Sequence, residues 1–307
     1  QLKGRKMTDF SETDISSQDG KTVFITGANT GIGFETARVL AVSGSRVLLG
    51  CRSEEKALGA INKIKAIKGD ADVLWVPLDL TSLASIKAAA AVVSKERRLD
   101  ALINNAGVMI PPKQETSDGF ELQFGVNHLG HFALTGHLLH KLKDQSGARI
   151  VNVSSLAHRN GRIDYKDIHA EKKYARMTRY SMSKFANILF TYELQRRLEK
   201  ANSSAISVAC HPGGSATELG RYLPSFFRLL LTPLNMLMNT PAEGALPTLM
   251  ATTSENVRGG DYFGPMRMGE LFHSAHKVDT TAASKDEVDA ALLWDLSTDL
   301  TGVEFAF

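Results

Sequence analysis

The sequence predicts a single doubly wound α/β domain, with a central parallel sheet of about seven strands and helices on both faces. Apolar, β-branched runs of strand length alternate with longer helical patterns along most of the chain, which is typical of β-α-β units. No repeat, low-complexity stretch or linker interrupts this alternation. The chain has 307 residues, of which 43% are hydrophobic and 22% charged, so one such domain can bury a sizeable core.

The expected elements follow one another in a regular order. Strands are predicted at residues 21–27, 45–51, 72–80, 99–105, 148–155 and 205–213, with a short seventh strand at 260–264. Helices are predicted at residues 31–44, from 54 onward, and at 82–97, 118–142, 178–200 and 285–297. Gly44 is expected to close the first helix, and Ser53 to cap the second, because Glu54 and Glu55 suit an electropositive first turn. Ser284 is expected to cap the last helix.

Composition excludes several classes of function. The formal charge of +3 comes from scattered basic residues, so no nucleic-acid-binding stripe is predicted. Cys51 and Cys210 lie far apart, which predicts free thiols, no thiolate metal site and a reducing, cytoplasmic location. Residues 1–20 are polar, so we expect an N-terminal tail with neither a signal peptide nor a membrane span.

A glycine-rich turn, TGANTGIG at residues 26–33, lies between the first predicted strand and the first predicted helix. Its glycines let the backbone turn tightly and approach a pyrophosphate, whose charge the helix N-terminus favours. The predicted cofactor contacts in this turn are Gly27, Asn29, Thr30, Gly31, Ile32 and Gly33.

The end of the second predicted strand indicates which dinucleotide binds. A carboxylate that would bond the adenosine ribose hydroxyls is expected about twenty positions after the glycines, but the strand ends in Gly50, Cys51 and Arg52. A guanidinium at this place suits a 2′-phosphate. The sequence therefore predicts NADP(H) as the cofactor, with Arg52 as a contact; the alternative is that Arg52 is only a solvated charge.

The stretch YSMSK places Tyr180 and Lys184 four residues apart, on one face of a predicted helix. A phenol with a pKa of about 10 is a poor acid or base at neutral pH, and a neighbouring cation favours its ionised form. This pair alone is weak support for catalysis, because the same spacing occurs by chance on surface helices.

Six ordered motifs resemble those of the short-chain dehydrogenases/reductases, and within them the retinol dehydrogenase-like group. They are TGANTGIG at 26–33, NNAG at 104–107, VNHLGHF at 126–132, RIVNVSSLAH at 149–158, YSMSK at 180–184 and HPG at 211–213. The resemblance runs from about Lys21 to Gly302. It implies a Rossmann-like domain at 21–302, followed by a C-terminal tail at 303–307, and an oxidoreductase acting on CH–OH donors.

The resemblance also implies roles for four residues. Tyr180 would donate or accept the proton of the reacting oxygen, and Lys184 would lower the phenol pKa and bond the nicotinamide ribose. Ser155, rather than Ser154, would bond the substrate oxygen. Asn127 would maintain a water-linked proton relay to the lysine.

Further cofactor contacts follow from the same resemblance, and they lie after the other strands. These are Asp79, Leu80, Asn105, Ala106, Gly107, Pro212, Gly213 and Thr217, together with Tyr180 and Lys184. Gly214 and Ser215 stand where related sequences often carry bulkier residues. Asn104 is interpreted either as part of this region or as a bridge between neighbouring strands.

Two further patterns concern metal binding and the substrate. No metal is predicted, because His128 and His137 would lie on opposite faces of one helix. The apolar stretch 222–238 is too short and too interrupted to span a bilayer. It is interpreted as a substrate lid, about 218–240, over a lipophilic aldehyde, ketone or retinoid-like substrate, or else as a surface that touches membranes or a partner.

The sequence thus predicts an NADP(H)-dependent oxidoreductase that transfers a hydride between the cofactor and an apolar carbonyl or alcohol. Two alternatives stay open: a double-bond reductase of the protochlorophyllide-reductase type, and a catalytically idle NADP(H)-binding regulator. A homodimer through the helices at 118–142 and 178–200 is a further expectation from the resemblance.

Overall fold

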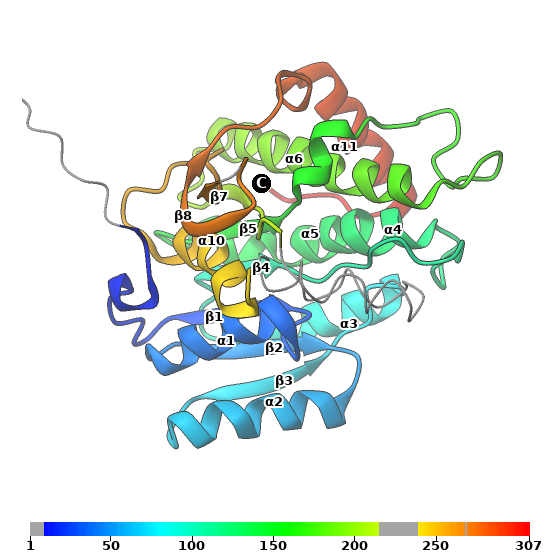
Figure 1. The fold of residues 1–307 in the computed structure, drawn as a ribbon. Helices are drawn as coiled ribbons and strands as arrows, with labels where there is room; N and C mark the ends of the chain where they lie inside the picture. The colour runs from blue at the N-terminus through cyan, green and yellow to red at the C-terminus, as the bar shows by residue number, and fades with distance from the viewer. Residues whose placement is uncertain (1–8, 215–238, 268) are drawn as a thin grey trace, which may run out of the picture.

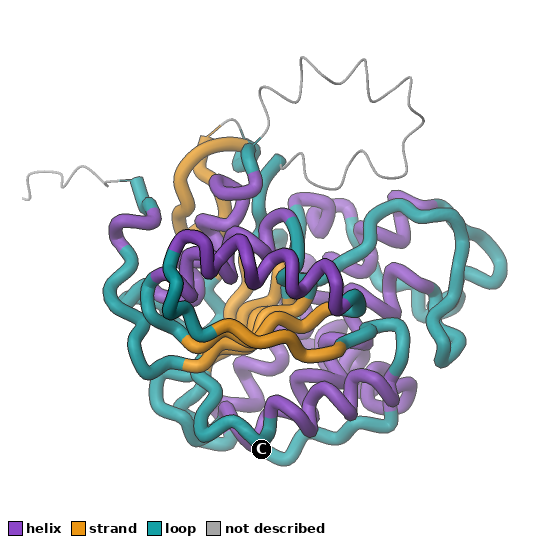
Figure 2. The backbone as a smooth tube through the Cα atoms, turned by 90° about the horizontal axis from the view of Figure 1, so that it is seen from below, coloured by secondary structure: helices purple, strands orange, loops and turns teal. Residues whose placement is uncertain are grey.

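The computed structural model describes residues 9–214, 239–267 and 269–307. One sheet lies between two layers of helices (Figures 1 and 2), and its strand order is β3-β2-β1-β4-β5-β6-β7-β8. Every neighbouring pair is parallel except β7 and β8, which are antiparallel. The predicted fold class is therefore confirmed, with a sheet one strand wider than expected.

The elements have the following bounds. The strands are β1 Thr22–Thr26, β2 Arg46–Cys51, β3 Val73–Pro77, β4 Ala101–Asn104, β5 Arg149–Val153, β6 Ile206–Cys210, β7 Tyr262–Arg267 and β8 Phe272–Val278. The α-helices are α1 Gly31–Val42, α2 Glu54–Ile67, α3 Leu83–Val93, α4 Leu122–Phe124, α5 Gly130–Leu142, α6 Arg176–Lys200, α10 Pro241–Thr253 and α11 Glu287–Thr301. Short 3₁₀ helices occupy Glu12–Asp14, Leu156–Asn160 and Ala282–Lys285, and a π-helical stretch covers Gly125–Leu129.

Two elements were missed by the sequence prediction. Strand β8, FHSAHKV, carries polar residues and pairs with β7 as the antiparallel edge of the sheet, so it has no apolar run to reveal it. Helix α10 contains Pro247, which argues against a helix interior. Its capping box was the available signal, because Thr240 Oγ1 accepts from Glu243 N and Glu243 accepts from Thr240 N.

Two helix starts were predicted wrongly. The helix expected at 118–142 begins at Leu122 and is interrupted by the π-helical stretch. Asp286, not Ser284, caps α11, since its carboxylate accepts from Val288 N at 2.9 Å and a carboxylate suits a helix N-terminus. The predicted cap of α2 is confirmed, because Ser53 Oγ accepts from Lys56 N at 3.3 Å.

Both faces of the sheet are buried, because successive strand residues point to opposite sides. On one side Phe24, Leu48 and Ile150 belong to a cluster with residues of α3, α5 and α6. On the other, Ile25 and Leu49 belong to a cluster with residues of α1, α2 and α10. The core thereby holds the carboxyl ends of the parallel strands at one edge, where ligands of doubly wound sheets bind.

The C-terminal segment packs against α5 and α6 (Figure 1). The ring of Phe132 on α5 lies 5.1 Å from that of Trp294 and 4.8 Å from that of Phe305, between centroids. Phe190 on α6 also stacks on Trp294. The last residues, expected to form a tail, therefore cover a face of the two helices through which a homodimer was expected.

Some expectations fall outside the described residues. Thr217, Ser215 and most of the expected lid at 218–240 lie there. Within the described ranges, no helix is both long and apolar enough to cross a membrane.

Candidate active site

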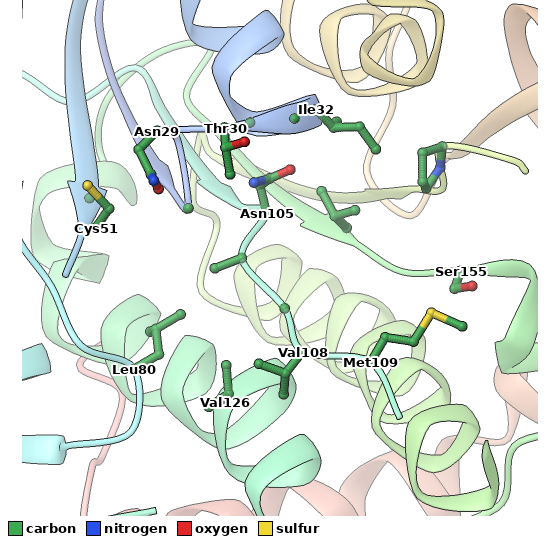
Figure 3. Close-up of a pocket in the computed structure, with 18 of the residues that line it drawn as sticks. Asn29, Thr30, Ile32, Cys51, Leu80, Asn105, Val108, Met109, Val126 and Ser155 are labelled. Atoms are coloured by element: carbon green, nitrogen blue, oxygen red, sulfur yellow. The ribbon is translucent and has the colours of Figure 1, made fainter. Parts of the chain in front are cut away.

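One cavity of about 1560 Å³ opens at the carboxyl ends of the central strands. It receives residues that directly follow β1, β4, β5 and β6, namely Gly27, Asn105, Ser154 and, two positions on, Pro212. Figure 3 shows Cys51 and Ser155 at opposite ends of it. Ligand pockets usually measure about 300–1,000 Å³, so this cavity has room for a dinucleotide and a substrate together.

The cavity collects nearly all of the predicted site residues. Those that line it are Gly27, Asn29, Thr30, Gly31, Ile32, Gly33, Arg52, Asp79, Leu80, Asn105, Ala106, Gly107, Ser155, Tyr180, Lys184, Pro212 and Gly213. Among the described residues, Asn127 is the exception that does not line the cavity. It is hydrogen-bonded to Val108, which does line it.

The glycine turn after β1 has the backbone that a dinucleotide-binding loop needs. Gly27 and Gly31 adopt left-handed φ angles of 66° and 57°. A Cβ on Gly33 would lie 2.4 Å from Gly27 O and 2.5 Å from Asn105 Nδ2. The turn can therefore pack against the start of α1 only because Gly33 has no side chain. The backbone of the turn stays accessible from the cavity, which suits a bound pyrophosphate.

Gly33→Ala should disrupt this loop. The added Cβ meets the backbone of Gly27, so the turn or α1 must shift, and overpacking of this kind costs about 1–3 kcal/mol. We expect a lower melting temperature and at least about tenfold weaker binding of the dinucleotide, measured by fluorescence titration, since about 1.4 kcal/mol corresponds to tenfold. Gly69→Ala is the matched control, because its Cβ would enter open space. Equal binding by both variants would contradict the assignment of the loop.

Thr26, at the end of β1, holds the adjoining loop in place. Its Oγ1 accepts from the backbone N–H of Asn105 and of Ala106, both at 2.9 Å, and lies 2.9 Å from His131 Nε2. His131 Nδ1 donates to Asn127 O at 3.0 Å, and burial lowers the pKa of His131 to about 4. The neutral ring thus offers Nε2 as an acceptor for the Thr26 hydroxyl. His131 was not among the predicted site residues, although its position four residues after Asn127 was the signal for this contact.

The end of the cavity near β2 is basic. Arg52 lines it together with Lys56 and Lys63 of α2. The two lysines are seven residues apart and so share a helix face. Sequence reasoning missed both lysines, although Lys56 follows Arg52 by only four residues; Lys63 reaches this end of the cavity through the packing of α2.

Lys184 lies beneath the other end of the cavity. It is only 4% exposed, and its Nζ donates to Val153 O at 3.1 Å. Burial lowers the pKa of Lys184 to about 8, because a low-dielectric environment disfavours the ammonium. Its Nζ is 5.9 Å from the centroid of the Tyr180 ring, so the spacing in sequence does bring the two groups together on α6.

Asn127 braces this region from the π-helical stretch. Its Oδ1 accepts from Val108 N at 2.8 Å, and its Nδ2 donates to Val108 O and to Ser183 Oγ, both at 2.9 Å. A Cβ on Gly107 would lie 3.2 Å from Asn127 Oδ1 and 3.4 Å from Lys184 Nζ. The amide therefore ties the loop after β4 to helix α6, directly above the lysine.

The two serines after β5 have different surroundings. Ser154 Oγ donates to Lys184 O at 2.8 Å, so its proton is already used in that hydrogen bond. Ser155 Oγ accepts from Ala157 N at 3.2 Å, at the start of a 3₁₀ helix, and its described contacts leave its own proton for an acceptor in the cavity. Ser155 is thus the better placed of the two to bond a substrate oxygen.

Other polar residues have structural partners. Asn104 Nδ2 donates to Asn152 Oδ1 at 2.8 Å and to Thr135 Oγ1 at 3.1 Å, so Asn104 bridges β4, β5 and α5. His128 Nε2 contacts Ser297 Oγ at 2.8 Å. Over the described part of the chain, no cluster of three or more His, Cys, Asp or Glu residues could hold a metal ion.

Comparison with known proteins gives a consistent result. The family model described as short chain dehydrogenase matches residues 21–225, more than half of the chain. Human retinol dehydrogenase 11 is 44% identical over 92% of this chain and 86% of its own length, and human retinol dehydrogenase 14 is 41% identical over 94% and 89%. The crystal structure of an uncharacterized protein from Mycobacterium paratuberculosis has 38% identity and a TM-score of 0.82, covering 98% of this chain and 100% of that one.

Proposed function

Because this chain belongs to the short-chain dehydrogenase family, we propose that it is an NADP(H)-dependent oxidoreductase acting on a lipophilic carbonyl or alcohol. The observation that carries the proposal is that one cavity contains both the glycine turn, with room for a pyrophosphate, and the Tyr180–Lys184 pair. When bound there, the dinucleotide supplies the hydride for reduction of a carbonyl and accepts it on oxidation of an alcohol.

The chain's own side chains would handle the proton and the oxygen. Tyr180 would donate its phenolic proton to the carbonyl oxygen in reduction and recover it in oxidation. The buried ammonium of Lys184 would stabilise the phenolate left behind. Ser155 would hydrogen-bond the same oxygen as negative charge develops on it, and Asn127 would keep the surrounding loop in register.

The preference for NADP(H) rests on charge at the end of the cavity near β2. Arg52, Lys56 and Lys63 all line this end, and no carboxylate stands at the end of β2 to bond ribose hydroxyls. A 2′-phosphate would neutralise part of this positive charge and could form charge-assisted hydrogen bonds with the guanidinium. Arg52 is therefore proposed as the main determinant, with the two lysines adding to the local positive potential.

The proposal of a lipophilic substrate rests on the side chains at the other end of the cavity. Met109, Leu156, Met177 and Leu271 line it, and Figure 3 shows Met109 near Ser155. The two human relatives named above are retinol dehydrogenases by name, and retinol is a long apolar alcohol. Burying an apolar chain stabilises binding by about 0.8 kcal/mol for each CH₂ group, so long substrates should bind more tightly than short ones.

The test is NADPH oxidation by the purified protein against a panel of short aldehydes, long-chain aldehydes, retinal and aromatic ketones. We expect kcat/KM to be at least about tenfold higher for the apolar members than for the short aldehydes, since two or more buried CH₂ groups are sufficient for that factor. Much faster turnover of small polar carbonyls would overturn the substrate class, while turnover of no carbonyl despite tight NADPH binding would favour a regulator.

Location and oligomeric state complete the proposal. We propose a cytoplasmic protein, because Cys51 and Cys210 are both free and buried and suit a reducing compartment. A homodimer would have to use a face other than the one that Trp294 and Phe305 cover. Sedimentation of the purified chain would decide between monomer and dimer.

A further inference from the structure

We propose that Glu270 is a positioning residue that holds two neighbouring walls of the cavity, formed by the loops after β5 and β6, at a fixed spacing. The proposal rests on the function above and extends it to a residue in the turn between β7 and β8, far in sequence from every motif of the site. Glu270 itself does not line the cavity, although the next residue, Leu271, does.

The carboxylate of Glu270 contacts two other parts of the chain. Its Oε1 accepts from Arg159 Nη2 at 2.6 Å, and its Oε2 lies 3.1 Å from His211 Nε2. The backbone of Glu270 has a left-handed φ of 68°, which is unfavourable for a residue with a side chain. The three residues come from three separate segments of the chain, so one carboxylate joins them.

Arg159 connects Glu270 to the wall that carries Ser155. It belongs to the 3₁₀ helix Leu156–Asn160, which starts immediately after that serine. In the same helix, His158 Nδ1 donates to Ser155 O at 2.7 Å. Fixing this helix therefore fixes the backbone that orients the Ser155 hydroxyl.

His211 connects Glu270 to the wall formed by Pro212 and Gly213. The imidazole is fully buried, and burial lowers the pKa of His211, which favours the neutral ring. Its Nδ1 accepts from Gly213 N at 3.2 Å, so its Nε2 carries the proton and donates to Glu270. The carboxylate thus selects the tautomer that holds the Gly213 backbone.

Close packing restricts the positions of the His211 ring and of the Gly213 backbone. A Cβ on Gly264 would lie 2.0 Å from His211 Nε2, so the imidazole ring fits against β7 only because residue 264 has no side chain. A Cβ on Gly213 would lie 2.5 Å from Leu271 O, and Gly214 N donates to the same oxygen at 2.9 Å. The turn that presents Glu270 therefore also contacts the loop after β6 through its backbone.

If the Arg159–Glu270 ion pair served only to stabilise the fold, its loss would change stability rather than turnover. Arg159 is 39% exposed and Glu270 20% exposed, and partly exposed pairs contribute little to stability. Their main effect should be on the relative position of Ser155 and Gly213, because a small displacement of reacting groups lowers turnover strongly. The basic end of the cavity, near Arg52, lies at the opposite side and should still bind the cofactor.

The test compares Glu270→Ala and Glu270→Gln with Glu255→Gln, an exposed control near β7. For a carbonyl that the wild type reduces, we expect kcat to fall at least tenfold in Glu270→Ala. The dissociation constant of NADPH should change less than threefold. Glu270→Gln, which keeps the shape of the side chain and covers a failure of the alanine variant to fold, should show a smaller loss of kcat.

A second readout does not depend on activity. Amide hydrogen exchange of peptides covering 155–161 and 210–214 should accelerate in both Glu270 variants and stay unchanged in Glu255→Gln. Wild-type kcat in the Glu270 variants, or unchanged exchange at both loops, would overturn the positioning role while leaving the proposed function intact. If the wild type reduces no carbonyl, the proposed function fails, and the exchange experiment alone decides the role of Glu270.

Discussion

Replacing Tyr180 with phenylalanine should lower carbonyl turnover by a factor of about 10²–10⁴, the usual contribution of a positioned acid or base. The ring and its packing remain, but no group is left to donate a proton to the carbonyl oxygen. Binding of NADPH should be nearly unchanged, because the glycine turn and the basic end of the cavity are untouched. The measurement is kcat for the best carbonyl of the panel, with the NADPH dissociation constant determined in parallel.

The size of this effect depends on Lys184. A phenol is useful near neutral pH only if its ionised form is stabilised, and each pKa unit requires about 1.4 kcal/mol. The Lys184 ammonium is buried and lies against the Tyr180 ring, where little water screens its charge. The pKa of Lys184, about 8, leaves it mostly protonated at neutral pH.

Tyr165→Phe is the matched control for Tyr180→Phe. It removes a phenolic hydroxyl that bonds Asp289 outside the cavity, and should leave kcat unchanged. If Tyr180→Phe retained wild-type turnover, the catalytic assignment would be wrong. A protein that only senses NADP(H) would show no turnover in either form and the same cofactor binding in both.

Arg52→Asp should reverse the cofactor preference. The substitution removes the guanidinium that is proposed to face the 2′-phosphate and places a carboxylate where NAD-dependent proteins of this fold bond the ribose hydroxyls. Repulsion between the carboxylate and the phosphate adds to the loss of a charge-assisted hydrogen bond, so we expect NADPH to bind about 10²–10³-fold more weakly, that is, by about 3–4 kcal/mol. NADH should bind more tightly than to the wild type.

Dissociation constants for NADPH and NADH, measured on the same preparations, check this prediction. Arg97→Asp is the control, because Arg97 is exposed, does not line the cavity and undergoes the same change in charge. An unaltered ratio of the two constants in Arg52→Asp would mean that Arg52 is only a solvated charge. Lys56→Ala should give a smaller loss of NADPH affinity, since it removes one of three neighbouring cations.

Local sequence pattern was sufficient for much of the fold and for part of the site. Strands β1 to β7 were predicted because buried parallel strands are continuous apolar runs. The glycine turn depends on residues next to one another in the chain, and Tyr180 and Lys184 depend on the period of a helix. Strand β8 was missed because this particular edge strand carries several polar residues, and helix α10 was missed because Pro247 contradicts local helix propensity.

Contacts between distant segments could be established only by the folded chain. Arg159, His211 and Glu270 come from three separate segments of the chain, and His131 contacts Thr26 across 105 positions. Lys63 lines the same cavity as Arg52 because α2 packs beside β2. Spacing in the sequence shows which residues share a face of one helix or strand. The distance between residues of separate elements is set by strand order and by the packing of the core. The sequence alone therefore indicated most of the chemical groups of the candidate site. The folding of the sheet and its helices decided how those groups are arranged in space.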